Sequence, residues 1–199
     1  MGDKETRIPQ QKRSIEKKQK IKNAAVKLMS SKGYFSTSSN EIAKEAGVSI
    51  GTFYSYFKDK KTLYTELVED VYVTVTGPLK DLEIPEDMPL EEVVRAYITM
   101  VFKGHEVESD FQREIASLSE QSDEFRQIEM DCKGDVIKMF AGMLEPYSAY
   151  LKVKDLNTAS YLILTSTEAV VHDVVFHRKK KNKKAVIDEL TAMICNYLF

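Results

Sequence analysis

Residues Ser38 to Lys60 combine aromatic residues at helical spacing with polar, small and aromatic residues between them. Phe53 and Phe57 lie four residues apart, so they share one helix face and point into a core. The polar, small and aromatic residues around them must then face largely outward. A short helix with such an outward face is built like one that reads the major groove of duplex DNA. The predicted DNA-contacting residues are Ser39, Asn40, Ser49, Ile50, Gly51, Thr52, Tyr54, Ser55, Tyr56 and Lys60.

Four of these residues suit contacts to the DNA backbone, which fix position and affinity. Lys60 begins a predicted helix, where the helix dipole already favours an anion such as phosphate. The hydroxyls of Tyr54 and Tyr56 can donate to phosphate oxygens, and Gly51 has no side chain to keep the backbone away from DNA. A purely structural role for the two tyrosines, as a cover for a small core, stays open.

Local signals predict a helix, a tight turn and a second helix to position these side chains. Ser38 and Glu41 have the spacing of a capping box at the start of a helix. Gly47 accepts the left-handed backbone that often ends a helix, and Ser49 can cap the next one. A generic turn in a three-helix bundle that binds no nucleic acid is the alternative.

At this point the sequence resembles the TetR (tetracycline-repressor-like) family of transcription regulators, over roughly Lys12 to Leu67. The matching residues are Gly47-Val48-Ser49, Gly51-Thr52-Phe53-Tyr54, Tyr56-Phe57, Lys60 and Leu63, with Ile21, Ala24, Leu28 and Lys32-Gly33-Tyr34 upstream. The resemblance implies a homodimer whose last helices form a four-helix bundle. It also implies a small ligand held among the middle helices, whose binding releases DNA.

The positions expected to read bases depart from common patterns of that family. Members often carry Lys or Arg where Ile50 and Ser55 stand here, and Arg where Asn40 stands. A bidentate Arg is the commonest reader of guanine, whereas Asn can pair with adenine and an apolar group can pack on the thymine methyl. We therefore hypothesise an operator with A·T-rich contacted positions.

Charge is distributed unevenly along the chain. Residues 1–60 hold 13 Lys and Arg against 6 Asp and Glu, a net of +7, and the remaining residues carry −9, which together give −2. A basic head on an acidic body is typical of a two-part DNA-binding protein. The predicted organisation is a flexible tail (1–11), a helix-turn-helix domain (12–60), a connecting helix (61–78) and a ligand-binding and dimerisation domain (79–199).

The composition excludes several other classes of protein. The two cysteines, Cys132 and Cys195, lack CxxC spacing, which indicates a reducing compartment rather than a disulfide framework. The first 20 residues are polar and charged, and no apolar run approaches the roughly 20 residues of a membrane span. We expect a cytoplasmic protein that is not an enzyme, with no cofactor and no metal.

Helical periodicity continues through the rest of the chain, so the predicted fold is all-α with about nine helices. Gly77-Pro78 is predicted to stop the connecting helix, and Pro146 to kink or end a later one. The later helices are predicted over Leu90 to Val107, Glu108 to Gln121, Asp123 to Leu151, Asp155 to His177 and Lys183 to Leu198.

Methionine and aromatic side chains in the middle helices are candidates for a ligand pocket, because they adapt to irregular apolar ligands. They are Tyr97, Met100, Val101, Phe111, Met139, Phe140, Met143 and Tyr147. The same spacing is also that of plain core, and the alternative stays open for each residue. The identity of the effector does not follow from the sequence.

A two-turn recognition helix covers too few base pairs to find one site, so such modules act as dimers on pseudo-palindromic operators. Apolar stripes on the last two helices are the candidate dimer interface, with intramolecular core as the alternative. The candidates are Ile163, Val170, Val171, Val186, Ile187, Leu190, Met193, Ile194 and Tyr197.

Two further groups of residues are expected to be structural. Glu168 with His172, and Asp173 with His177, are i,i+4 pairs that favour a helix surface or interface over a metal site, since no third ligand is visible. The basic run Arg178 to Lys184 favours a solvated loop over a second contact with nucleic acid.

The prediction for the whole chain is a sequence-specific DNA-binding regulator, most simply a repressor that a small apolar or amphipathic ligand releases from its operator. A regulator of the same fold that answers to a protein partner, or that acts as an activator, is the alternative. An all-α enzyme with a DNA-binding head is a third reading, against which the lack of a recognisable catalytic motif in the sequence counts.

Overall fold

The computed structural model describes residues 10–80, 89–107, 109–177 and 182–199, and within these ranges the chain forms nine α-helices and no strand. The all-α prediction is therefore confirmed. The helices are α1 (Gln10–Lys32), α2 (Ser39–Glu45), α3 (Ile50–Tyr56), α4 (Lys60–Lys80), α5 (Leu90–Glu106), α6 (Ser109–Gln121), α7 (Asp123–Leu144), α8 (Leu156–His172) and α9 (Lys183–Leu198). No helix in these ranges has both the length and the apolar character that crossing a membrane requires.

The chain divides into two compact units, residues 1–67 and 68–199, which we call the head and the body. The boundary falls inside α4, so the predicted connecting helix (61–78) contributes to both units. Parts of the predicted tail (1–11) and of the basic run from Arg178 to Lys184 lie outside the described residues, as do residues 81–88.

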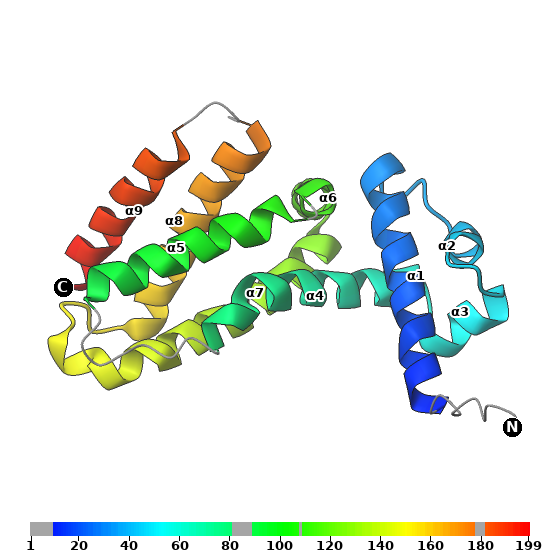
Figure 1. Ribbon diagram of the computed structural model, residues 1–199, viewed down its shortest axis with the longest axis horizontal. Helices are drawn as coiled ribbons and strands as arrows, with labels where there is room; N and C mark the ends of the chain where they lie inside the picture. Colours follow the sequence, from blue (N-terminus) through cyan, green and yellow to red (C-terminus); the bar gives the residue numbers. More distant parts are fainter. Residues whose placement is uncertain (1–9, 81–88, 108, 178–181) are drawn as a thin grey trace, which may run out of the picture. The chain divides into compact units, whose positions relative to one another are not determined.

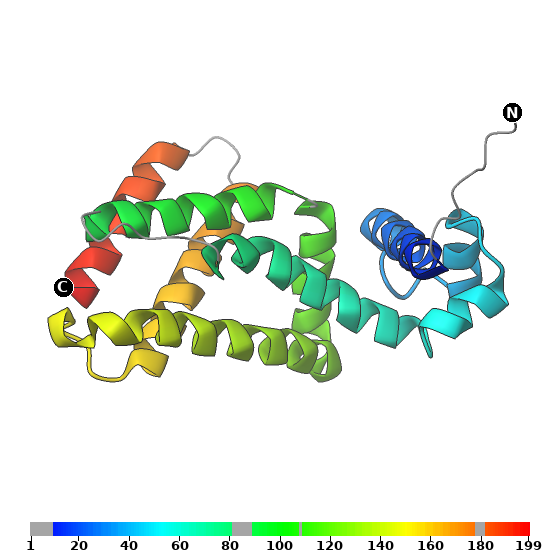
Figure 2. The same cartoon turned by 60° about the horizontal axis from the view of Figure 1, so that its bottom comes forward.

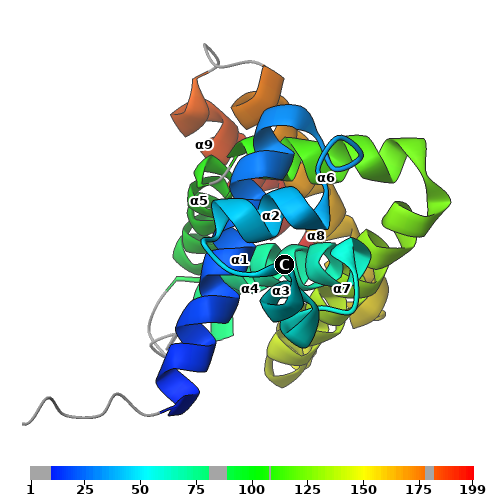
Figure 3. The same cartoon turned by 90° about the vertical axis from the view of Figure 1, so that its right-hand side faces the viewer.

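The head is a bundle of short helices around aromatic side chains. Figure 3, which faces the head, shows α2 and α3 beside the longer α1. Phe53 and Phe57 are fully buried, together with Ile42 of α2 and Tyr64 at the start of α4. The predicted inward position of the two phenylalanines is confirmed, and their burial leaves the opposite side of α3 to solvent.

Helix α4 continues to Lys80, so the prediction that Gly77-Pro78 would stop it is wrong. Proline removes one backbone hydrogen bond and crowds the preceding turn, but packing on one side can hold the helix together. Val75 and Thr76 are buried in the body just before the proline. Only two helical residues follow Pro78, so the helix still ends within one turn of it.

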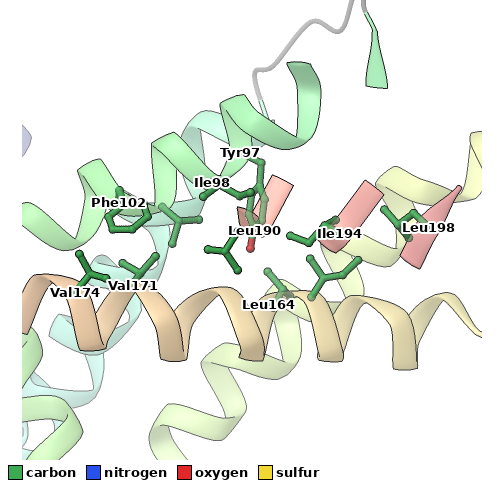
Figure 4. Close-up of a cluster of buried hydrophobic side chains, with 11 residues drawn as sticks. Tyr97, Ile98, Phe102, Leu164, Val171, Val174, Leu190, Ile194 and Leu198 are labelled. Carbon is green, nitrogen blue, oxygen red and sulfur yellow. The ribbon is translucent and has the colours of Figure 1, made fainter. Parts of the chain in front are cut away.

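The core of the body lies where α5, α8 and α9 meet (Figure 1). Figure 4 shows Tyr97, Ile98 and Phe102 of α5 facing apolar side chains of the other two helices. Helix α8 and the turn that follows it contribute Ile163, Leu164, Val171 and Val174, and α9 contributes Leu190, Ile194 and Leu198. Burial of such side chains stabilises the fold by about 1.5–3 kcal/mol each before entropy is counted.

The chain reverses direction after α7, as Figure 2 shows. Helix α7 ends at Leu144 and passes into a 3₁₀ segment, η1 (Glu145–Tyr150), with proline in its first turn. The predicted effect of Pro146 is therefore confirmed. Asp155 then caps α8 by accepting a hydrogen bond from the amide of Thr158 at 3.1 Å, and a π-helical turn, η2 (Asp173–His177), extends α8.

Candidate DNA-binding face and body cavity

Capping bonds between neighbouring residues set the geometry of the helix-turn-helix. The Ser38 hydroxyl accepts from the amide of Glu41 at 3.3 Å, and the Glu41 carboxylate accepts from the amide of Ser38 at 2.9 Å. The capping box predicted from the sequence is thus present. Gly47 has φ +67°, the left-handed conformation that ends α2 and turns the chain toward α3.

Glu41 also bonds to the end of α1, through Lys32 Nζ at 2.6 Å. This ion pair and the bonds from Ser38 lower the pKa of Glu41 to about 2. The carboxylate therefore stays ionised over the whole neutral and mildly acidic range, and it ties α1 to the start of α2.

The outward face of α3 carries most of the side chains that the sequence predicts at DNA. Ser49 caps the helix by accepting from the amide of Thr52 at 3.1 Å, which places it at the start of the exposed face. Tyr54 is 55% exposed and Ile50 is 37% exposed. Gly51 and Ser55 are exposed as well, and so is Asn40 on α2. Ser39 and Thr52 are half-buried.

Tyr56 and Lys60 hold more partners than the sequence suggests. The Tyr56 hydroxyl lies 3.0 Å from Ser14 Oγ of α1. Lys60 Nζ donates to the carbonyls of Tyr34 and Thr37, both at 2.6 Å, and lies 4.0 Å from the centre of the Tyr34 ring. Burial lowers the pKa of Lys60. Both side chains therefore brace the helices that carry the face.

A pair of lysines on α1 ties that helix to the first turns of α4. Lys18 and Lys22 both contact the Glu66 carboxylate, at 2.7 and 2.6 Å. These interactions lie within the head, so the orientation of α1 relative to this part of α4 is held by charge as well as by packing.

The body contains a cavity of about 70 Å³ with walls from α4, α5, α6, α7 and α8. Ligand pockets for drug-sized molecules are usually about 300–1,000 Å³, so this space holds only a few water molecules as it stands. Its walls are Val71, Tyr72, Val75, Thr76, Tyr97, Val101, His105, Gln112, Ile115, Ala116, Glu129, Lys133, Val136, Leu164, Glu168 and His172.

Helices α4 and α5 approach each other closely at this cavity. A Cβ atom placed on Gly104 of α5 would lie 2.9 Å from Val75 Cγ2 and 3.1 Å from Val75 Cα. Such distances are shorter than ordinary contacts, so only glycine fits at position 104 with α4 in its present place. Any residue with a Cβ would have to displace α4.

Charged and titratable groups converge on the cavity. Lys133 Nζ donates to Glu168 at 2.5 Å, and Glu129 accepts from the hydroxyl of Ser119. Burial raises the pKa of Glu129. Burial also lowers the pKa of His105, and it lowers that of His172 to about 4. Both imidazoles are therefore neutral at pH 7 and can accept as well as donate hydrogen bonds.

The residues predicted for a ligand pocket are spread over several sites in the body. Tyr97 and Val101 line the cavity described above. Tyr97 also faces a second cavity of about 70 Å³, between α5, α7 and α9, which Phe140, Met143 and Tyr147 line as well. Phe111 is fully buried, Met139 packs against the core, and Met100 lines an open groove along α5.

The residues predicted at a dimer interface are also divided. Four of them are buried in the core of this chain, namely Ile163, Val171, Leu190 and Ile194. Val170, Val186 and Ile187 are half-buried and pack against that core. Met193 and Tyr197 remain exposed, and so do two residues outside the predicted set, Tyr161 and Leu162.

The polar residues of the cavity wall escaped sequence-based prediction. Glu168 and His172 were expected at a helix surface or interface, but the structure places both in the wall, next to His105 of α5. No spacing rule connects His105 to residues more than 60 positions away. Tyr72 and Thr76 did carry a signal, since they lie four residues apart on α4 and share one face.

The exposed α3 on a three-helix head, followed by an all-helical body, defines the class of helix-turn-helix regulators. Residues 21–67 match the family model described as bacterial regulatory proteins, tetR family, and residues 89–198 match that of the tetracyclin repressor-like C-terminal domain. The second match alone spans more than half of the chain. The chain therefore belongs to the TetR family of transcriptional regulators.

Individual relatives agree with this assignment. The transcriptional regulator YerO of Bacillus subtilis is 33% identical over 99 residues, which make up 48% of this chain and 34% of that protein. The chain thus matches about a third of the length of that relative. The structure of the fatty acid degradation regulator FadR from Bacillus halodurans superposes with a TM-score of 0.73, at 20% identity, over 96% of both chains.

A second FadR structure, from Bacillus subtilis, was determined in complex with stearoyl-CoA. It is 21% identical and has a TM-score of 0.73, over 88% of this chain and 96% of that one. At this level of identity the two FadR structures establish the shared fold of head and body.

Proposed function

We propose that the protein is a repressor that binds a pseudo-palindromic operator as a homodimer and leaves it when a small effector enters the body. The observation that carries this proposal is the exposed face of α3, on which Tyr54, Ile50 and Ser55 stand clear of a core that Phe53 and Phe57 already fill. A helix exposed in this way at the end of a helix-turn-helix fits the major groove.

The proposed operator is rich in A·T pairs at the contacted positions. Asn40 and Ile50 are both exposed, so an amide and an apolar group are available where many family members have arginine. The amide pairs with adenine and the apolar group packs on thymine methyls. Backbone contacts come from Tyr54 and the exposed lysines, and from Lys60 once DNA competes with its two carbonyl partners.

The proposed effector site is the cavity walled by α4. An effector larger than about 70 Å³ enters only if a wall moves, and α4 is the wall that continues into the head. Effector binding therefore favours a body with a displaced α4, which changes how the two heads of a dimer are presented to DNA. The present cavity corresponds to the effector-free form in this scheme.

The walls fit an amphipathic effector. Apolar side chains of α4, α5 and α6 supply most of the surface, and a few polar groups such as Gln112 and Lys133 supply orientation. Stearoyl-CoA, bound by the FadR of Bacillus subtilis, is a ligand of this class on a similar fold.

The proposed dimer forms through the outward faces of α8 and α9. On α8 the exposed or half-exposed residues at 158, 161, 162, 165, 166 and 169 follow helical spacing, and Tyr161 and Leu162 are 49% and 47% exposed. On α9 the residues at 189, 192, 193, 196 and 197 do the same, and Met193 is 48% exposed. A second copy is the proposed occupant, because two heads are needed to read a palindrome.

Two substitutions in the proposed interface, compared with one control substitution outside it, test this surface. Leu162→Arg and Met193→Arg place charges in the proposed interface and should shift the protein from dimer to monomer in sedimentation experiments. Tyr150→Arg is the control, because Tyr150 is 75% exposed but lies on η1, outside both faces. A dimer that survives both interface substitutions contradicts the proposed surface.

Selection of bound duplexes from random DNA, followed by transcription in vitro, tests the function as a whole. The proposal predicts a palindromic site with A·T pairs under α3, and lower transcription from a promoter that contains it. Acyl-CoA and other amphipathic molecules should then restore transcription. An increase on adding the protein alone would indicate an activator, and a site dominated by guanine would contradict the proposed base contacts.

A further inference from the structure

Three potential metal ligands from two helices meet in the wall of the cavity. They are His105 of α5, and Glu168 and His172 of α8, and one ligand atom from each lies within 4.8 Å of the other two. The two imidazole rings have centroids 4.8 Å apart. We propose that these three side chains bind a divalent first-row transition-metal ion, for which Zn²⁺ is the reference case.

The hydrogen bond of His105 determines which of its two ring nitrogens is free to bind a metal. Its Nδ1 lies 2.8 Å from the carbonyl oxygen of Val101, and a carbonyl can only accept, so Nδ1 carries the proton. Nε2 then has the free lone pair that a metal needs. Imidazoles that bind metals commonly donate their other ring N–H to a carbonyl or carboxylate, which fixes the orientation of the ring.

Helix α8 supplies the other two ligands from one face, since Glu168 and His172 lie four residues apart. Lys133 Nζ donates to one carboxylate oxygen, Oε2, at 2.5 Å, which leaves Oε1 for an ion. Phe176 packs 4.8 Å from the His172 ring, centre to centre, and limits its rotation. Each ligand thus has a neighbour that holds it.

Two imidazoles and one carboxylate make up a ligand set found at zinc sites with an open position and at non-haem iron(II) sites. Zinc lies about 2.0–2.1 Å from such ligands, which places the donor atoms of a tetrahedral site about 3.4 Å apart. The widest allowed separation of 4.8 Å closes to this value with a movement of about 1.4 Å. The fourth position can be filled by water from the cavity.

Charge in the cavity also favours a cation. Two carboxylates, Glu129 and Glu168, line the space against one ammonium, Lys133. When both carboxylates are ionised the wall carries a net negative charge, and a divalent ion reverses it. The binding of such an ion goes beyond the proposed regulatory function and does not depend on it, because neither DNA nor a dimer is involved.

Calorimetric titration of the full chain with Zn²⁺, after removal of bound metal with a chelator, tests the proposal. We expect one ion per chain. His105→Ala and His172→Ala should each weaken binding at least about 100-fold, the upper end of the loss typical of an outer-shell partner. His177→Ala is the matched control, because this exposed histidine lies outside the cluster and its removal should leave the affinity unchanged.

The wild-type chain allows a second test that does not depend on the folding of a variant. It contains three histidines, so three sets of ring signals are expected in a magnetic resonance spectrum. Zn²⁺ should shift the signals of His105 and His172 and leave those of His177 in place. Absence of saturable binding up to about 1 mM Zn²⁺ would overturn the proposal. So would full affinity in the His105→Ala/His172→Ala double variant, which would place the ion elsewhere, for instance on a cysteine.

Discussion

Replacing Gly104 with alanine perturbs the contact between α4 and α5 on which the proposed coupling depends. The new Cβ would lie 2.9, 3.1 and 3.3 Å from Val75 Cγ2, Cα and Cβ. Ordinary contacts begin near 3.4 Å, so the α4 backbone at Val75 must retreat by about 0.3 Å. Unlike a flexible side-chain tip, a helix backbone moves only as part of its element.

The magnitude follows from two opposing effects. Alanine in place of glycine stabilises a helix interior by about 0.5–1 kcal/mol, whereas an extra methyl group in a packed site costs about 1–3 kcal/mol. We therefore expect the free energy of unfolding of Gly104→Ala to fall by about 0–2.5 kcal/mol. Operator affinity should fall with it, by a factor of about 5–150 if the full coupling energy between body and head is engaged.

Gly134→Ala separates the two effects. Gly134 lies within α7, and a Cβ placed there meets no atom within 4 Å. This variant should be more stable than the wild type by about 0.5–1 kcal/mol and should bind the operator normally. Urea denaturation and fluorescence anisotropy with a selected operator duplex measure both quantities. If the two glycine variants have equal stability and equal affinity, the reasoning about α4 is refuted.

Three further predictions concern the head. Glu41 has a pKa of about 2 in the folded chain, so the stability it contributes is present above its unfolded pKa and is lost as the pH falls from about 4.5 to 2. In the Glu41→Gln variant, the free energy of unfolding should therefore depend less on pH in that window. Lys60→Met leaves the carbonyls of Tyr34 and Thr37 without their ammonium partner and should destabilise the head by about 1–3 kcal/mol in thermal unfolding, whereas a Lys60 that mattered only for phosphate would leave the melting temperature unchanged. Asn40→Ala should cost about 1–3 kcal/mol at one base position and relax its preference for adenine in binding-site selection, and equal losses on every sequence would assign Asn40 to the DNA backbone instead.

The head could be predicted from the sequence because its signals are local. A capping box, a left-handed glycine and two phenylalanines four residues apart each depend on neighbours within a few positions. The structure confirms all three. Since only a few positions of a two-turn helix can face inward, the remaining positions of α3 must be exposed.

The cavity and the side-chain cluster of the body could not be predicted in the same way, because they bring together residues from distant segments of the chain. The cavity draws its walls from five helices, and His105 meets Glu168 only through the packing of α5 on α8. Helical periodicity identifies Ile163 and Leu190 as apolar-face residues but does not say whether the face meets this chain or another one. The prediction that Gly77-Pro78 stops α4 was wrong for a related reason, because the packing of Val75 outweighed the local signal to end the helix.

The measurement that tests the central claim most directly is the affinity of the full chain for a selected operator duplex, with and without the Tyr54 side chain. Tyr54 is 55% exposed on α3, so Tyr54→Ala should leave helix content and melting temperature unchanged. The loss of a hydrogen bond to phosphate, worth about 1.5–3 kcal/mol, should weaken binding roughly tenfold or more. Tyr150→Ala, which removes an exposed aromatic from the body, should have no effect. Equal affinities for all three proteins would contradict the assignment of α3 as the surface that meets DNA.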